Sequence, residues 1–187
     1  MTVTFPIPGW LPNPDQLQDS GATLLGVVAD SLDQLGSPNR NFQRRLFTHG
    51  ETALWIPDAD QIVVSLAKVY LGRAGEEQYQ FDKGVLGKYG FVTLAFDVAV
   101  VHGGWPTVEG GIGPRLPEQN ALMSATSSLW HDGWVAFSAL RALALGGITT
   151  TPPVCPIVQD NVMVGPMSAK GPSGKNAGLE LQVLLQV

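Results

Sequence analysis

The sequence predicts an α+β fold, in which two main helices pack on one face of an antiparallel or mixed β-sheet and a C-terminal β-hairpin protrudes. Two long segments carry apolar residues at steps of three and four, which is the spacing of one helix face. Other segments alternate apolar and polar residues or are rich in β-branched residues, as strands are. The order along the chain is helix, strands, helix, strands. That order favours a layer of helices on one face of a sheet.

The first segment, residues 1–14, is rich in proline. We expect no helix before Pro14, because proline cannot continue a helix through its interior. The segment is instead expected to be an extended N-terminal arm with three apolar anchors, which are Phe5, Ile7 and Trp10. Such an arm either wraps its own domain or reaches a neighbouring molecule. Residues 15–187 are expected to form a single α+β domain.

The first helix is expected over residues 15–35. Its apolar stripe consists of Leu17, Gly21, Leu24, Leu25, Val28, Leu32 and Leu35. Gly36, Ser37 and Pro38 then end the helix. Gly21 and Gly26 weaken it by about 1 kcal/mol each if they are exposed. They would also allow the helix to pack closely on a sheet.

Three strands are expected between the two helices. The mixed segment 40–49 is the first, and the segment 62–71, apolar on both faces, is expected to lie centrally in the sheet. The third strand covers 91–101. Its apolar face, expected to meet the helices, consists of Val92, Leu94, Phe96, Val98 and Val100. The polar segment 73–90 is expected to be a long connection or an inserted hairpin.

The second helix is expected over residues 118–145, after a loop dense in glycine and proline. Gly133 is expected to kink this helix or to split it in two. The predicted buried side of the helix consists of Leu122, Ala125, Leu129, Trp130, Phe137, Leu140 and Ala144.

The C-terminal segment alternates with period two. Its apolar face is expected to consist of Leu179, Leu181, Val183, Leu185 and Val187. Glu180, Gln182 and Gln186 fall on the opposite face. Because a loop rich in Gly, Pro, Ser and Lys separates it from a strand at 162–164, we expect a long projecting hairpin tip rather than a tight turn. Shortening 168–176 is accordingly expected to leave the fold intact.

The composition limits the classes of function. The chain has 187 residues, of which 44% are hydrophobic and 14% charged, against about 25% charged on average. A surface with so few charges is often buried in an assembly. The net charge is −5 and no basic cluster exceeds Arg44-Arg45, which argues against a nucleic-acid-binding face. No membrane helix or signal peptide is expected, since no apolar run approaches the roughly 20 residues that a membrane helix needs.

No catalytic, metal-ligating or cofactor-binding set is predicted. His49, His102 and His131 are far apart, and we interpret them as surface or satisfied histidines. His131 and Asp132 are neighbours, but adjacent residues on a helix do not face each other. The lone Cys155 permits neither an internal disulfide nor a multi-cysteine metal site, and is interpreted as a small buried apolar residue.

Three further segments have simple interpretations. Asp58 and Asp60 lack the following Gly and Glu of a calcium loop, so they are expected to form a turn before the strand. The glycines of 110–113 are expected in a flexible loop, because Pro114 blocks the helix that a phosphate-binding loop needs. Asp97 is expected to be exposed or paired at an interface.

Tryptophans are the remaining candidates for function. Trp130 is expected in the core. Trp10, Trp55 and Trp105 lie in predicted loops or arms. They are either local caps over the core or anchors of an interface, where tryptophan is enriched. The sequence leaves both interpretations open.

Four features together carry a family resemblance. They are the helix at 15–35, the strand pair 62–71 and 91–101, the long helix 118–145, which opens with Glu-Gln-Asn-Ala-Leu, and the ending Val-Gly-Pro … Gly-Pro-Ser-Gly … Ala-Gly over 164–178. This layout resembles the tail terminator proteins of long-tailed, siphovirus-type bacteriophages. The ending is the most specific feature and is similar to such proteins from phages of high-GC Gram-positive bacteria. The arm 1–14 and the segment 73–90 are not part of the resemblance.

The resemblance implies a structural virion protein and not an enzyme, with no cofactor. Six copies would form a ring that caps the tail tube protein, ends tail polymerisation and meets the head-completion or stopper protein. DNA would pass through the lumen without sequence-specific binding, and an acidic balance suits such a channel. The protein would be assembled in the host cytoplasm and located in the tail or neck of the virion. The candidate interface residues are Trp10, Trp55, Trp105, Lys170, Ser173 and Lys175.

Two alternatives stay open. Another head–tail connector, such as a stopper or head-completion ring, would differ in its position in the particle. A small hydrolase or binding module would need a concave pocket with convergent polar groups, and the sequence does not reveal one.

Overall fold

The computed structural model describes residues 14–47, 55–71, 92–106, 116–145, 162–173 and 175–186. In this part of the chain, the elements in order are α1 (Pro14–Leu35), β1 (Gln43–Phe47), β2 (Gln61–Leu71), β3 (Val92–His102), α3 (Leu116–Ala144), β4 (Val162–Ser173) and β5 (Asn176–Gln186). The arm 1–13, Trp10, His49, segment 73–90, loop 110–113 and Cys155 lie outside the described residues.

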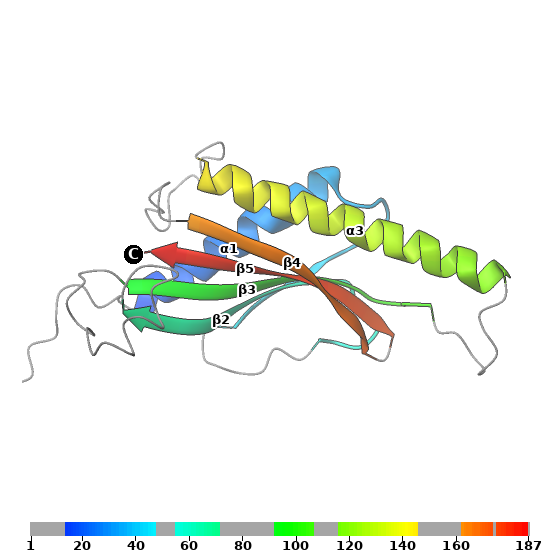
Figure 1. Ribbon diagram of the computed structural model, residues 1–187, viewed down its shortest axis with the longest axis horizontal. Coiled ribbons are helices and arrows are strands. Elements are labelled where there is room, and N and C mark those ends of the chain that lie inside the picture. The colour runs from blue at the N-terminus through cyan, green and yellow to red at the C-terminus, as the bar shows by residue number, and fades with distance from the viewer. Residues whose placement is uncertain are drawn as a thin grey trace, which may run out of the picture.

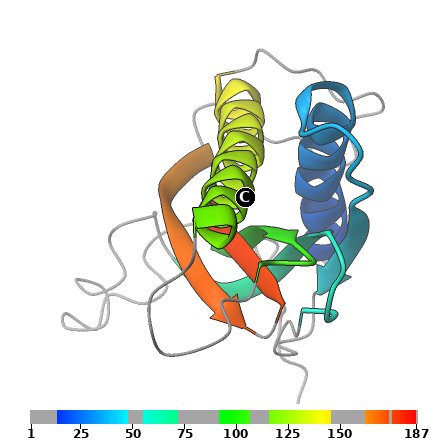
Figure 2. The ribbon, with the colours of Figure 1, turned by 90° about the vertical axis from the view of Figure 1, so that its right-hand side faces the viewer.

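The five strands form one mixed sheet in the order β1-β2-β3-β5-β4. Strand β1 pairs with β2 in parallel, and the other three pairings are antiparallel. Both helices cover the same face of this sheet (Figures 1 and 2). The predicted α+β fold, the mixed sheet and the C-terminal hairpin are therefore confirmed. Strand β2 lies inside the sheet, as expected, although β3 is its middle strand.

The core fills the space between the helices and the sheet. Leu24 and Val28 of α1, Phe96 of β3, Leu140 of α3 and Leu181 of β5 are all fully buried in it. Burying each such side chain contributes about 1.5–3 kcal/mol. The period-two patterns of β3 and β5 therefore assigned their helix-facing sides correctly.

Glycines mark where the helices come closest to the sheet. A Cβ on Gly21 would lie 2.6 Å from a methyl carbon of Leu46 in β1, so α1 packs closely there. A Cβ on Gly26 would have nothing within 4 Å, so this glycine serves no close approach. A Cβ on Gly133 would lie 2.3 Å from Leu179 of β5. Gly133 therefore does not split α3, which is one continuous helix, but lets it lie against β5.

The predicted orientation of α3 is wrong at Trp130. This side chain is 38% exposed, and the buried side of the helix instead carries Leu129, Ala136, Leu140 and Leu143. The physical reason is that α3 has large apolar side chains on more than one side. Spacing alone does not tell which apolar side faces the sheet.

The predicted long hairpin tip is also wrong. Strand β4 continues through Gly165 and Pro166 to Ser173, which pairs with Asn176, so that the connection is a tight turn. The strand register shifts between Val164 and Met167, which is how this edge strand accommodates a proline. Shortening 168–176 would therefore remove paired strand residues and not a free loop.

The turn of the hairpin is tied to the rest of the domain. The backbone N–H of Trp105 donates to the carbonyl of Lys175 at 2.7 Å. The side-chain amide of the buried Asn176 donates to the carbonyl of Ile56, also at 2.7 Å. The β4–β5 turn is thus held against the ends of β2 and β3.

Candidate functional site

A buried hydrogen-bonded pair of side chains joins the sheet to α3. Nε2 of His102, at the end of β3, lies 2.7 Å from Oδ2 of Asp132, and both side chains are fully buried. The other carboxylate oxygen of Asp132 accepts the backbone N–H of Ser37 at 2.7 Å. Burial acts to raise the pKa of Asp132, but the hydrogen bonds from His102 and Ser37 outweigh it and hold the pKa below its ordinary value.

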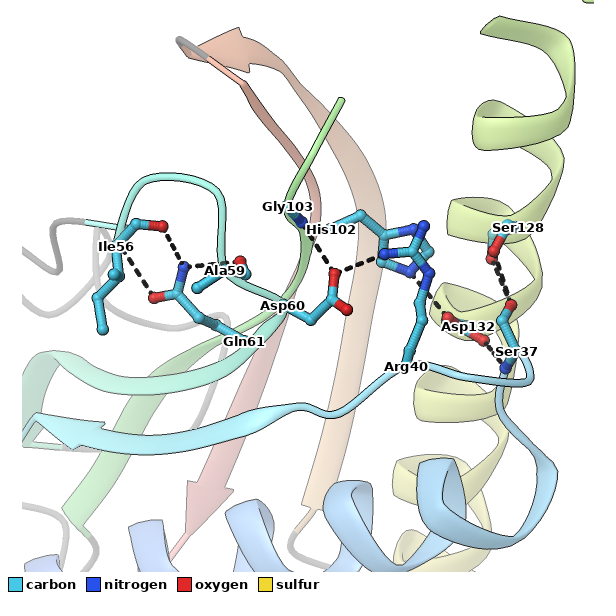
Figure 3. Close-up of polar contacts among 10 residues, drawn as sticks. All are labelled: Ser37, Arg40, Ile56, Ala59, Asp60, Gln61, His102, Gly103, Ser128 and Asp132. Carbon is cyan, nitrogen blue, oxygen red and sulfur yellow. Dashed lines mark hydrogen bonds and ion pairs between the residues drawn. The ribbon is translucent and has the colours of Figure 1, made fainter. Parts of the chain in front are cut away.

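Two serines extend this network (Figure 3). The Ser128 hydroxyl of α3 donates to the Ser37 hydroxyl at 2.8 Å, just beyond the end of α1. The network therefore fixes the end of α1, the end of β3 and the middle of α3 to one another. We define Ser37, His102, Ser128 and Asp132 as the polar corner.

The polar corner contains serine, histidine and aspartate, but not in the order of a hydrolytic triad. Both serines lie on the aspartate side, whereas a nucleophile would have to contact the other ring nitrogen of the histidine. That nitrogen, Nδ1 of His102, is buried without a hydrogen-bond partner in the described part of the chain. The centroid of the imidazole ring lies 5.9 Å from the centroid of the Phe42 ring. The geometry supports a structural role.

A second polar cluster orders the turn before β2. Asp60 accepts hydrogen bonds from the Arg40 guanidinium and, at 2.9 Å, from the backbone N–H of Gly103. The Gln61 side chain bonds to both the N–H and the carbonyl of Ile56. The predicted turn at Asp58 and Asp60 is confirmed. Within the described ranges, no group of three or more His, Cys, Asp or Glu is placed to hold a metal ion.

The two described loop tryptophans both pack on small apolar clusters. Trp55 contacts the cluster of Val63, Ala99 and Val101, whereas Trp105 contacts a cluster that contains Leu179. Both side chains are half-buried. The structure therefore favours the cap interpretation for these two residues.

The candidate residues of the hairpin do not gather at one site. Lys170 forms an ion pair with Glu180 at 2.8 Å across the β4–β5 pair. Lys175 lies 3.8 Å from Asp58 and is exposed. Ser173 pairs with Asn176 through the backbone at the end of β4.

Asp97 lies on the sheet face away from the helices, near this lysine–glutamate pair. Burial and the neighbouring Glu180 carboxylate raise the pKa of Asp97, and Lys170 and Gln182 only partly oppose this. Its carboxylate is half-buried and therefore not fully exposed, while pairing at an interface stays a prediction.

A large apolar surface lies on the side of α3 that faces away from the sheet. Met123, Trp130 and Trp134 are exposed there, together with Leu145 directly after the helix. They recur at steps of seven, four and eleven residues, which places them near one line that also carries the exposed Arg141. Leu35, at the end of α1, is 66% exposed beside them. We define these five apolar residues as the outer face.

A groove of about 430 Å³ opens on the outer face between α1 and α3. Its lining includes Ser31 and Leu35 of α1 together with His131, Trp134, Ser138 and Ala139 of α3. The Trp134 ring, which is 55% exposed, packs edge-on against Phe137 at 5.5 Å. Nε2 of His131 lies 2.9 Å from the Leu35 carbonyl, which holds the end of α1 to α3 beside the groove.

Sequence reasoning missed both the polar corner and the outer face. Asp132 lies among the buried apolar residues of α3, and a carboxylate at such a position was a usable signal. Its partner His102 lies on another element, and no local pattern identifies it. The spacing of Met123, Trp130 and Trp134 in the sequence could have shown that they share one side of α3, but the prediction assigned Trp130 to the core.

No protein-family model matches the chain, and comparison with curated proteins finds no match. In the part of the chain that the structure describes, neither helix is long and apolar enough to span a membrane.

Proposed function

We propose that this chain is a structural virion protein, a tail terminator subunit that forms a ring on the end of a phage tail tube. The ring, with six copies as the resemblance implies, ends polymerisation of the tail tube protein and joins the tail to the head. The observation that carries the proposal is that α3 exposes large apolar side chains on the side turned away from the sheet, in addition to those that it buries against the sheet. Exposed apolar side chains that lie together mark sites of association.

The exposed side of α3 supports assembly for a physical reason. Leaving Trp134, Met123 and Leu145 in water forgoes the stabilisation that their burial would give. Tryptophan is enriched among the residues that dominate binding energy at interfaces. Covering the outer face with another subunit recovers that stabilisation and removes the apolar surface from water.

A ring also requires two different surfaces on each subunit, because its contacts are heterologous. The helical layer presents the apolar outer face. The sheet presents a different kind of surface on its far side, where Asp97, Glu180 and Lys170 gather. The net charge of −5 suits a lumen through which DNA passes, since it offers little fixed positive charge to retain phosphates.

The decisive experiment is electron microscopy of lysates in which this chain is truncated by an early stop codon. Overlong, headless tails of variable length are expected, because tube growth would no longer be stopped. Tails of normal length that fail to join filled heads would instead assign the chain to the head side, as a stopper or head-completion protein. Ordinary infectious particles would contradict both assignments.

A further inference from the structure

We propose that two copies of the chain pair through their outer faces, with their α3 helices side by side and antiparallel. The exposed residues on this side of α3 are spaced symmetrically. The steps along the series Met123, Trp130, Trp134 and Arg141 are seven, four and seven residues. The series is therefore the same from either end of the helix, and its centre lies midway between the two tryptophans.

This symmetry selects a second copy as the partner. In a two-fold contact the same surface serves both copies, so that a residue i that contacts j is itself contacted as j contacts i. When two α3 helices run antiparallel about the centre of the series, Trp130 of each copy lies opposite Trp134 of the other. Met123 likewise lies opposite Arg141. The four tryptophans then cover one another at the centre of the contact, where the residues that dominate binding energy are usually found.

Arg141 selects the antiparallel direction over the parallel one. It is exposed on the same line of α3 as the tryptophans. In a parallel pair the two Arg141 guanidinium groups would meet and repel. In the antiparallel pair they are separated by 18 residue positions, or about 27 Å along the helix axis, which exceeds the screening length of about 10 Å. Each arginine can instead lay its apolar stem over the partner's Met123 and keep its charge in water.

The groove between α1 and α3 lies where the contact needs an apolar recess. Trp134 of one copy is placed opposite residue 130 of the other. Residue 130 is next to His131, which lines the groove and holds the Leu35 carbonyl at 2.9 Å. The partner's Trp134 therefore lies beside the groove and covers Leu35, which is otherwise 66% exposed. By symmetry, the second groove of the dimer is covered in the same way.

This contact is isologous, whereas the contacts of the proposed ring are heterologous. Both use the outer face, so that a subunit makes one contact or the other. The dimer is therefore the form of the unassembled protein, in which the outer face stays out of water until a ring subunit displaces the second copy. The dimer does not depend on the tail function, because it requires only two copies of this chain.

Cysteine crosslinking tests the antiparallel pairing in full-length protein that carries Cys155→Ser. The variants Met123→Cys and Arg141→Cys are prepared separately with different affinity tags, mixed and equilibrated, and a short bismaleimide is added. We expect covalent dimers that carry both tags, because position 123 of one copy faces position 141 of the other. Each variant alone is the matched control. It should give at least tenfold fewer dimers, because its two cysteines lie about 27 Å apart along the axis.

Two outcomes would overturn the proposal. If either variant alone were crosslinked as efficiently as the mixture, like positions would meet, and the pairing would be parallel or unspecific. If the mixture gave no covalent dimers at any protein concentration, the two outer faces would not meet at all. Neither result depends on whether the chain acts on a phage tail.

Sedimentation equilibrium of two further variants tests the centre of the contact. Trp134→Ser removes one of the two central tryptophans from each copy and should raise the dissociation constant of the dimer at least tenfold. Val69→Ser removes an apolar side chain that is 49% exposed on β2 and not on α3, and it should change the dissociation constant less than twofold. Equal weakening by both substitutions would mean that general apolar association, and not the outer face, holds the copies together.

Discussion

The two sides of α3 reverse the usual distribution of residue types. Its inner side buries the Asp132 carboxylate against His102, with both side chains removed from water. Its outer side leaves two tryptophans and a methionine exposed. The Asp132 carboxylate is tolerated inside because His102 and the Ser37 N–H bond both of its oxygens, whereas exposed apolar groups that lie together mark a partner from outside. The inner side therefore concerns the stability of this domain, and the outer side concerns its assembly.

The largest effect on stability is expected from Asp132→Ala. The substitution leaves His102 buried beside a cavity and the Ser37 N–H without its acceptor, and each buried polar group left unsatisfied costs about 1–3 kcal/mol. Denaturant unfolding at pH 7 measures the loss. The exposed Asp33 pairs with Arg44 on the surface, so Asp33→Ala should change stability by less than about 1 kcal/mol.

The same substitution has a pH signature. Because the folded-state pKa of Asp132 is lowered, its contribution is present above the unfolded value of about 3.9 and is lost as pH falls through the folded pKa. The stability difference between the wild type and Asp132→Ala should therefore shrink in acid. A difference that stays constant from pH 7 to pH 3 would contradict the ionised carboxylate.

Two glycine substitutions separate the tightly packed part of the molecule from the open part. Gly133→Ala places a Cβ 2.3 Å from Leu179, and overpacking of this kind costs about 1–3 kcal/mol, partly offset by the higher helix propensity of alanine. Gly26→Ala meets nothing within 4 Å and should stabilise the domain by up to about 1 kcal/mol. Thermal unfolding of the two variants should therefore shift in opposite directions.

Elements with a regular local pattern could be predicted from the sequence. Features that depend on contacts between residues far apart in the sequence could not. Period two identified the buried faces of β3 and β5, because the alternation is local and one face must be apolar. The prediction failed over 165–173, because Gly, Pro and Ser usually mark a loop. Only the pairing with β5 makes this segment a strand. His102 and Asp132 are 30 residues apart in sequence, and only the packing of α3 on the sheet brings them together.

A smaller effect is expected from Asp97→Asn on the far face of the sheet. The folded-state pKa of Asp97 is raised, so its charged form disfavours the folded state at neutral pH. Removing the charge should raise the unfolding temperature modestly at pH 7, and the gain should disappear below about pH 4, where Asp is protonated in the unfolded state as well. A gain that persists unchanged at pH 3 would point to better packing and not to charge.

The smallest effect on stability is expected from Trp134→Ser, and this prediction sharpens the contrast between the two sides of α3. The side chain is more than half exposed, and surface substitutions usually change stability by no more than about 0.5 kcal/mol. Because Trp134 does contact Phe137, a loss near that upper limit is expected in denaturant unfolding at low protein concentration. Assembly should respond in the opposite proportion, since the outer face loses one of its two tryptophans. If Trp134→Ser instead unfolded the domain as strongly as Asp132→Ala, the outer face would belong to the core, and its exposure would no longer indicate a partner.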